Sequence, residues 1–379
     1  MQLPPLALYI HLPWCERKCP YCDFNSHAAL DFPESAYVDA LLRDLRGDLP
    51  LVRERTVQSL FIGGGTPSLF SPAAIARLLR EVGVLLPLSP HLETTMEANP
   101  GSAEADRLFA FRQAGVNRLS LGVQSFDDDC LRALGRVHDS EQAHAAVALA
   151  RGAGFASVNI DLMHGLPRQS TGSALRDLRC AIDHAPAHLS WYQLTIEPNT
   201  AFHKRPPLLP VEDVLDEIQT AGAQLLERGG YRQYEISAWC RSGFECRHNL
   251  NYWRFGDYLG IGAGAHGKIS SGDGSVQRYA KKRQPEHYLA AQSGQFCAGR
   301  RTLHRQDLIA EFMLNALRLN EGFSPTQFST RTGLPFASLE PQLTGMCERG
   351  LLQRSAKFIR ATDLGRRFLD DVIAGFFPD

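Results

Sequence analysis

The sequence predicts an α/β fold: a partial (β/α)6 barrel, an accessory α+β segment and a small C-terminal helical domain of winged-helix type. Two patterns between residues 6 and 230 predict the barrel. Short apolar runs indicate buried strands, and amphipathic stretches between them indicate helices. Nearly continuous apolar strands that alternate with helices are typical of a parallel sheet covered by helices. The predicted domains span 1–230, 231–300 and 301–379.

Six apolar runs are the expected strands of the barrel, at 6–12, 59–63, 92–98, 118–124, 157–163 and 189–197. The helices expected between them lie at 34–47, 72–85, 103–114, 140–153 and 171–184. Ser71 and Pro72 supply an N-cap and a first-turn proline for the second of these helices. Glycines at the ends of helical stretches favour termination there, and we expect this at Gly83, Gly115 and Gly154.

The pattern changes after the proline-rich segment 206–210. A helix is expected at 211–228 and a strand at 233–239, followed by an aromatic and glycine-rich stretch, 244–274, that favours sheet and loop. From 302 onward the chain becomes helical and ends in a short hairpin, which resembles a winged-helix module. Winged helices often bind DNA, but this one carries little excess positive charge, so protein contact or packing is the preferred interpretation.

Composition excludes several classes of protein. The chain has 379 residues, 21% of them charged, and a formal net charge of −1, so no nucleic acid partner is expected. No apolar run is long enough to span a membrane, and the first residues do not form a secretory signal. The nine cysteines contain a single tight group, which favours a cytoplasmic protein with one metal site over a disulfide framework. Peripheral membrane contact and a homodimer stay open.

The tight group consists of Cys15, Cys19 and Cys22, directly after the first predicted strand. An iron–sulfur cubane normally takes four cysteines, but position 24, where a further cysteine would be expected, is Phe24. Three thiolates leave one iron open to another ligand. The alternative is a zinc site with His11 or His27 as fourth ligand, although such sites usually contain two C-x₂-C pairs and this chain has no second pair.

Polar and glycine residues follow the next strands. The run 63–67, Gly-Gly-Gly-Thr-Pro, allows the backbone to approach a ligand closely, although a simple tight turn is the alternative. Glu97 ends the third strand, Gln124 ends the fourth, Asp161 lies in the fifth, and Arg136 follows a glycine turn. At the carboxyl ends of parallel strands these side chains are expected to converge on one pocket. The run 262–267 fits G-x-G-x-x-G, but a strand and turn follow it, so we discount a dinucleotide site.

These motifs together resemble the radical S-adenosylmethionine (SAM) superfamily. Within it, the chain resembles the coproporphyrinogen oxidase-like branch over nearly its whole length. Residues 248–253, His-Asn-Leu-Asn-Tyr-Trp, match the HNxxYW motif of the haem chaperones of that branch. Two departures from the true oxidases put porphyrinogen decarboxylation in doubt. These oxidases carry CxxxCxxCxC, whereas Phe24 stands here, and they have a longer segment before the residue that matches Tyr9.

The resemblance implies a [4Fe–4S] cluster on the three cysteines and SAM on the open iron. By this resemblance the first SAM contacts Tyr9, Gly64 and Glu97. A second SAM-binding set known in the oxidase branch matches Tyr21, Gly65, Thr66, Gln124, Arg136 and Asp161. Thr195 is a weaker match to that second set, because the family residue there is small and apolar.

The leading functional hypothesis is a haem chaperone that binds haem, the cluster and SAM and passes haem to acceptor proteins, without oxidase activity. His248 is the candidate haem ligand and Cys246 the second candidate, because haem iron accepts histidine or cysteine. The alternative for His248 is a hydrogen-bonded core histidine. Rival functions are an oxygen-independent coproporphyrinogen III oxidase, a radical SAM enzyme with another substrate, and a non-enzymatic adaptor.

Overall fold

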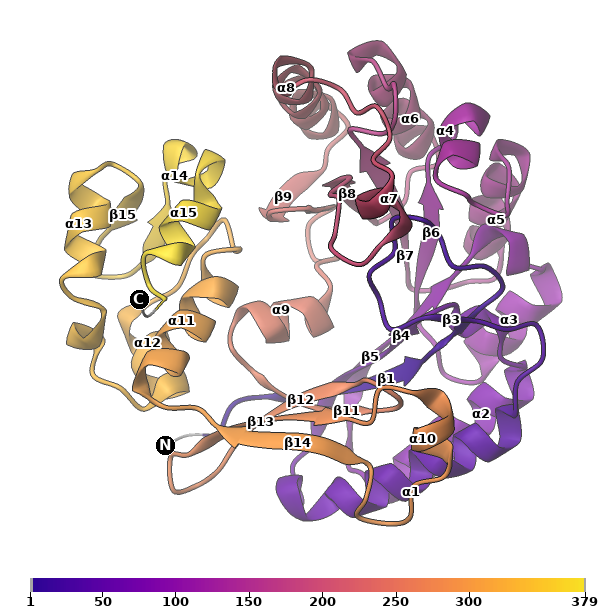
Figure 1. The fold of residues 1–379 in the computed structure, drawn as a ribbon, viewed down its shortest axis with the longest axis horizontal. Coiled ribbons are helices and arrows are strands. Elements are labelled where there is room, and N and C mark those ends of the chain that lie inside the picture. The colour runs from indigo at the N-terminus through magenta and orange to yellow at the C-terminus, as the bar shows by residue number, and fades with distance from the viewer. Residues whose placement is uncertain (1–2, 378–379) are drawn as a thin grey trace.

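A twelve-stranded mixed sheet forms the centre of the computed structural model, which describes residues 3–377 (Figure 1). Its parallel part consists, in spatial order, of β11 (Asp257–Ile261), β1 (Leu6–Leu12), β4 (Val57–Gly64), β5 (Leu88–Ala98), β6 (Arg118–Gln124), β7 (Ser157–His164) and β8 (His188–Gln193). The six strands predicted for the barrel are therefore confirmed. β11 is an addition that the sequence did not indicate, since it pairs with β1 from a distant part of the chain.

Most helices between residues 34 and 228 cover the outer side of the curved sheet (Figure 1). The helices of this part of the chain are α1 (Glu34–Val52), α2 (Pro72–Leu85), α3 (Ala105–Gln113), α4 (Asp128–Ala133), α5 (Ser140–Gly152), α6 (Thr171–Asp183), α7 (Ala201–Lys204) and α8 (Glu212–Arg228), with short 3₁₀ turns η1 (Pro67–Leu69) and η2 (Pro100–Ser102). The short helix α7 instead lies against the loop after β1, where the Phe202 amide donates to the Pro20 carbonyl at 3.0 Å. Because helices lie on one face and the barrel interior on the other, β1 is buried at nearly every position.

Helix ends follow the sequence signals at most of the expected places. The Ser71 side chain accepts a hydrogen bond from the Ala74 amide at 3.1 Å, as an N-cap should. Gly115 and Gly154 follow α3 and α5 with positive φ angles, a conformation that favours glycine. The prediction for Gly83 is wrong, because α2 continues to Leu85. Val82 and Leu86, four residues apart, are both buried on the core side and hold the chain helical past the glycine.

The second half of the chain extends both ends of the same sheet. β10 (Ala238–Cys240) and β9 (Arg232–Glu235) add antiparallel to β8, and β12 (His266–Ser270), β13 (Val276–Lys281) and β14 (Cys297–Thr302) follow β11, with α10 (Pro285–Leu289) before β14. The expectation of sheet and loop throughout 244–274 is wrong at α9 (Arg247–Trp253). This short helix contacts β1 and β4 and lies between the two ends of the open barrel (Figure 1).

The C-terminal domain packs around its own core. It contains α11 (Arg305–Ala316), α12 (Pro325–Thr332), η3 (Phe336–Leu339), α13 (Gln342–Glu348), the hairpin β15 (Leu352–Arg354) and β16 (Ile359–Ala361), α14 (Asp363–Arg367) and α15 (Leu369–Ala374). Phe312 stands edge-on to Phe323 and Phe328, with ring centroids about 5 Å apart. Within residues 3–377, no helix has both the length and the apolar character needed to cross a membrane.

A buried ion pair fastens α1 to the sheet. Lys281 of β13 is 3% exposed, and its Nζ lies 2.6 Å from both Asp44 Oδ1 and Asp48 Oδ2. Burial raises the pKa of Asp44 to about 6, while Lys281 opposes that rise. Breaking a buried pair leaves uncompensated charge in the interior, which costs far more than losing a surface pair.

We expect Lys281→Met to lower the free energy of unfolding by about 3–5 kcal/mol, because two buried carboxylates lose their cation. Urea denaturation of the ligand-free protein measures this change. The control is Arg367→Met, which breaks the exposed Arg367–Asp216 pair and should cost about 0–1 kcal/mol. Equal losses in the two variants would contradict this assignment.

Candidate functional site

The three clustered cysteines lie in one loop at the carboxyl end of β1. Two short strands that pair with each other, β2 (Trp14–Cys15) and β3 (His27–Ala28), bracket this loop. Lys18 Nζ donates to the carbonyl oxygens of Phe24 and Ser26, at 3.1 and 3.2 Å, and so closes the loop from within. Cys15 is buried, while Cys19 and Cys22 are half-buried, and all three are free thiols. The sequence therefore places three sulfur donors in a short, internally braced segment.

The glycine run after β4 is bonded to the backbone of this loop. The Gly65 amide donates to the Leu12 carbonyl at 2.8 Å, and the Thr66 amide donates to the Trp14 carbonyl at 2.7 Å. A Cβ atom on Gly65 would lie 2.3 Å from the Trp14 oxygen, a distance that no side chain tolerates. Glycine is required here because the two backbones touch. The simple tight-turn interpretation is thus insufficient for this run.

The turn between β11 and β12 braces the loop from the other side. Asn25 Nδ2 donates to the carbonyl oxygens of Ala263 and Arg283, each at 2.9 Å. Gly262 and Gly264 both have positive φ angles, and a Cβ on Gly264 would meet the Asn25 amide at 2.4 Å. The G-x-G-x-x-G match at 262–267 therefore belongs to a turn that supports the cysteine loop.

Glu97, at the end of β5, is hydrogen-bonded to the glycine run. Its Oε2 accepts a hydrogen bond from the Gly64 amide at 3.1 Å. Burial, and next the nearby Asp161, raise the pKa of Glu97 to about 8, which the Gly64 hydrogen bond opposes. A cationic ligand that approaches this carboxyl group would stabilise its ionised form. Such a shift is typical of functional sites.

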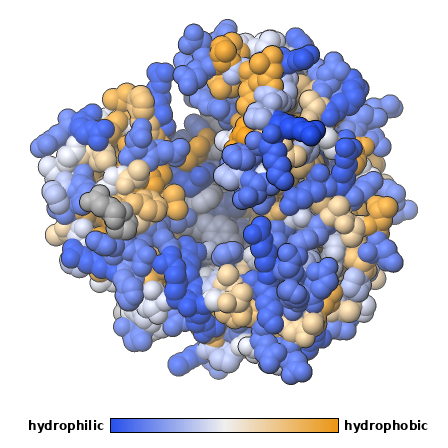
Figure 2. Space-filling view, in the orientation of Figure 1, coloured by the Kyte–Doolittle hydropathy of each residue, from blue (hydrophilic) through white to orange (hydrophobic). Residues whose placement is uncertain are grey.

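One cavity of about 580 Å³ inside the barrel, named here the barrel cavity, collects most of the predicted site. Its volume lies within the range of ligand pockets. Its lining includes, among the predicted residues, Cys15, Cys19, Cys22, Tyr21, Gly64, Gly65, Thr66, Glu97, Gln124, Arg136, Asp161 and Thr195. Figure 2 shows a hollow near the centre of the molecule, between the C-terminal domain and the barrel.

Two side chains meet near the carboxyl end of β6: Gln124, its last residue, and Arg136, which follows α4. Gln124 has a φ angle of +69°, which a non-glycine residue adopts only when its surroundings compel it, and its Oε1 accepts from the Tyr192 hydroxyl at 2.7 Å. Arg136 donates through Nη2 to the Gly122 carbonyl at 2.7 Å, and its Nη1 lies 3.6 Å from Cys19 Sγ. Its buried Nε has no partner among the described residues. A cation beside the cysteine loop stabilises negative charge on sulfur.

Asp161 lies deeper, on β7, within a polar network. Its carboxylate accepts from Ser120 Oγ at 2.9 Å and from Asn159 Nδ2 at 2.8 Å. Burial raises the pKa of Asp161, and these hydrogen bonds oppose the rise. The sequence analysis missed Asn159 and Ser120, although their spacing of two from Asp161 and Gly122 places them on the inward face of their strands.

Tyr9 and His248 lie outside the lining of the barrel cavity. The Tyr9 hydroxyl is 3.0 Å from His11 Nδ1. His248 is 1% exposed, with Nδ1 3.3 Å from Ser59 Oγ and Nε2 3.0 Å from the Tyr252 hydroxyl. Burial, and next Arg118, lower the pKa of His248 to about 3. Haem ligation by His248 stays a prediction, and it requires the hydrogen bond of the ligating ring nitrogen, to Ser59 or to Tyr252, to break.

The HNxxYW segment is a helix with two different faces. His248 and Tyr252, four residues apart, face the core, whereas Asn249 and Trp253 line the barrel cavity. Arg318 of the C-terminal domain lies over the Trp253 ring at 4.2 Å and bonds Glu235 at 3.1 Å. Trp253 and Arg318 therefore close the side of the cavity. Cys246, the second candidate ligand, is fully buried, and burial raises the pKa of its thiol to about 12.

Within residues 3–377 no three His, Cys, Asp or Glu side chains are placed so as to hold a metal ion as they stand, so the three thiols would have to turn toward a cluster. Their surroundings favour a cluster with an open iron over a zinc site. His11 already uses both ring nitrogens, since Nε2 lies 2.9 Å from the Asn25 carbonyl and Nδ1 contacts Tyr9. His27 Nε2 lies 3.3 Å from Asn25 Oδ1. The three thiols instead border a cavity with room for a ligand beside them. Cys15, Cys19 and Cys22 would hold an iron–sulfur cluster beside this space.

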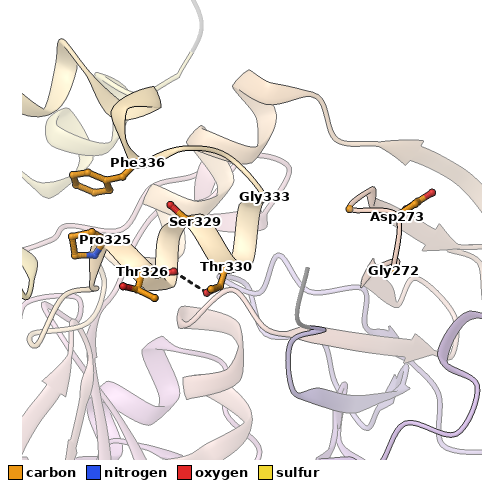
Figure 3. Close-up of a pocket in the computed structure, with 9 residues that line it drawn as sticks. Gly272, Asp273, Pro325, Thr326, Ser329, Thr330, Gly333 and Phe336 are labelled. Carbon is orange, nitrogen blue, oxygen red and sulfur yellow. Dashed lines mark hydrogen bonds between the residues drawn. The ribbon is translucent and has the colours of Figure 1, made fainter.

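A second cavity, of about 720 Å³, lies away from the cysteines, between the turn at 272–274 and α12 (Figure 3). Serine and threonine line it, and Thr330 Oγ1 donates to the Thr326 carbonyl at 2.9 Å. The Asp273 carboxylate is engaged by the Ser275 amide and hydroxyl. This cavity contains none of the sulfur donors or buried ionisable groups that distinguish the barrel cavity.

Comparison with known proteins identifies the class of protein to which this fold and this site belong. The Radical SAM superfamily profile matches residues 9–178, and the HemN C-terminal domain profile matches residues 303–368. A solved structure described as coproporphyrinogen III oxidase (HemN) from Escherichia coli, a radical SAM enzyme, superimposes with a TM-score of 0.84 at 26% identity. It covers 99% of this chain and 90% of that one. The partial barrel and its cysteine loop thus define a radical SAM protein.

Two relatives locate the chain more narrowly. The heme chaperone HemW of Escherichia coli (strain K12) is 49% identical over 100% of both chains. The heme chaperone HemW of Haemophilus influenzae is 46% identical over 100% of this chain and 99% of the relative. This chain belongs to the HemW family of radical SAM proteins.

The raised pKa of Glu97 predicts a pH dependence of stability. The folded-state pKa lies above the ordinary value of 4.5, so the protonated form favours folding at low pH. That contribution is lost as the pH rises from 4.5 through about 8. We expect the free energy of unfolding of ligand-free Glu97→Gln to fall less over this interval than that of the unchanged protein. Chemical denaturation across the pH range measures it, with the exposed Glu321→Gln as control. Parallel curves for the Glu97 variant and the unchanged protein would contradict the assignment.

Proposed function

We propose that this chain is a cytoplasmic haem chaperone. It holds a [4Fe–4S] cluster and SAM in the barrel, binds haem as its cargo and passes haem to acceptor proteins. The observation that carries the proposal is the full-length similarity to proteins named heme chaperone, at 49% identity. Phe24 supports it, because the oxidases that the chain resembles carry a further cysteine at that position.

Particular residues have defined tasks in this proposal. Cys15, Cys19 and Cys22 hold three irons and leave the fourth for SAM. When bound, the cluster and SAM supply a strongly reducing centre, since protein-bound clusters reach potentials down to about −700 mV. Glu97 and the Gly64 backbone receive the cationic end of SAM. Arg136, 3.6 Å from Cys19 Sγ, stabilises the negative charge on the sulfur ligands.

The mouth of the barrel cavity is the proposed haem entrance. Phe24, beside Cys22, is 62% exposed and lines the cavity. Asn249 and Trp253 also line the cavity, and the Arg318 guanidinium lies over the Trp253 ring. A flat apolar macrocycle with charged edges suits an opening bordered by aromatic rings and guanidinium groups. All nine cysteines are free thiols, as expected in the reducing cytoplasm.

Oxygen-independent coproporphyrinogen III oxidation is the second candidate. The structural similarity to an oxidase, with a TM-score of 0.84, favours it. The proposal ranks it second because Phe24 departs from the cysteine pattern of the oxidases and because the relatives with the highest identity reported above carry the chaperone name.

One anaerobic preparation separates the two functions. We expect the reconstituted protein to bind haem, with a saturable shift of the Soret band, and to transfer it to an apo-haemoprotein. The same preparation, given dithionite, SAM and coproporphyrinogen III, should form no protoporphyrinogen. Spectrophotometric titration and product analysis by chromatography measure both outcomes. Absence of haem binding would overturn the chaperone function, and stoichiometric product would establish the oxidase.

A further inference from the structure

A buried arginine in the barrel cavity has no partner. Arg118 is the first residue of β6, is 4% exposed and lines the cavity. Its Nε is buried without a hydrogen bond, and within residues 3–377 neither an ion pair nor a side-chain hydrogen bond engages its guanidinium. A guanidinium stays charged at any ordinary pH, so this position holds a buried, unpaired positive charge.

Among residues 3–377, the other two lysine or arginine residues that are buried as completely, Lys268 and Lys281, are paired. Lys268 lies 2.8 Å from Asp257 Oδ1, and Lys281 lies between two aspartates of α1. An uncompensated buried charge is costly, and natural proteins retain one mainly where a ligand supplies the counter-charge. Arg118 differs from the structural cations because it borders an open cavity.

The acidic groups around Arg118 are already engaged elsewhere. Glu93 Oε1 accepts from the His248 amide at 3.2 Å and from Cys246 Sγ at 3.7 Å. Asp161 is held by Ser120 and Asn159. These carboxylates, with Cys246 and Tyr234, raise the pKa of Arg118 from a distance, against the opposing effect of burial. None of them supplies the paired hydrogen bonds that a guanidinium makes with a carboxylate.

The position of Arg118 shows which part of a ligand it would meet. Residues 118, 120, 122 and 124 alternate along β6 and all line the cavity. Arg118 stands six residues before Gln124, so it lies about 20 Å down the strand from the end that carries the cysteine loop. A group that reaches Arg118 therefore belongs to the inner end of whatever fills the barrel.

We propose that the Arg118 guanidinium binds a carboxylate at the inner end of the ligand that occupies the barrel cavity. The inference rests on the proposed function, which supplies two sources of that carboxylate: a propionate of haem or the carboxylate of a second SAM. The planar fork of arginine matches either one through two parallel hydrogen bonds.

The test compares ligands with and without the carboxylate. Haem and its dimethyl ester are titrated into reconstituted protein and into Arg118→Met, with the Soret band as readout. SAM and decarboxylated SAM are compared by equilibrium dialysis in the same two proteins. For one of the two ligands, we expect the preference for the carboxylate form to fall about tenfold in Arg118→Met. Arg118→Lys keeps the charge but loses the planar guanidinium. Its preference for the carboxylate form should lie between that of the unchanged protein and that of Arg118→Met.

The matched control is Arg278→Met, which removes a half-buried arginine that pairs with Glu311 outside the barrel cavity. Its carboxylate preferences should equal those of the unchanged protein. If the preference for the carboxylate form falls in Arg118→Met for haem alone, Arg118 binds a haem propionate. If it falls for SAM alone, Arg118 binds the carboxylate of a second SAM. Unchanged preferences for both ligands would overturn the inference.

Evidence against the chaperone function would not by itself overturn the role proposed for Arg118. If the unchanged protein binds no haem, the chaperone function fails, and the SAM comparison still tests Arg118. If Arg118→Met does not fold, as judged by circular dichroism, Arg118→Lys provides the comparison. Preferences in Arg118→Lys equal to those of the unchanged protein for both ligands would then overturn the inference.

Discussion

The site depends on the close contact between two backbone segments. The cysteine loop and the glycine run touch through the Gly65–Leu12 and Thr66–Trp14 hydrogen bonds, at a separation that excludes any side chain on Gly65. The Gly64 amide also donates to the Glu97 carboxylate, so the carboxyl end of β5 lies at the same place. Three motifs far apart in the sequence thus become one wall of a cavity. The parallel sheet makes this contact available, because the carboxyl ends of its strands meet at one edge.

The barrel is open, and α9 with the C-terminal domain occupies its gap. The core face of α9 fixes the helix on β1 and β4 through His248 and Tyr252, while its other face presents Asn249 and Trp253 to the cavity. Arg318 reaches across from the C-terminal domain to Trp253 and Glu235. A movement of that domain would therefore alter the wall of the cavity directly.

The sequence predicted the parts of the molecule that follow local rules. Strand periodicity and helix caps located the parallel strands and their helices, and motif spacing located the cysteines, the glycine run and Glu97. Sequence patterns did not predict the features that depend on tertiary contacts. α9 has seven residues and no side-chain N-cap, so packing against β1 and β4, not local signals, makes it helical. The sequence marked Arg118 only as the first residue of a strand, and only the folded barrel shows that it lines the cavity without a hydrogen-bonded carboxylate.

The central claim is that three thiolates hold a cluster whose remaining iron accepts SAM. The most direct measurement is electron paramagnetic resonance of the anaerobically reconstituted and reduced protein, before and after SAM is added, together with iron, sulfide and zinc analysis. We expect about four irons per chain and a cluster signal that changes when SAM binds. Bound zinc in place of iron, or a cluster signal that SAM leaves unchanged, would contradict it.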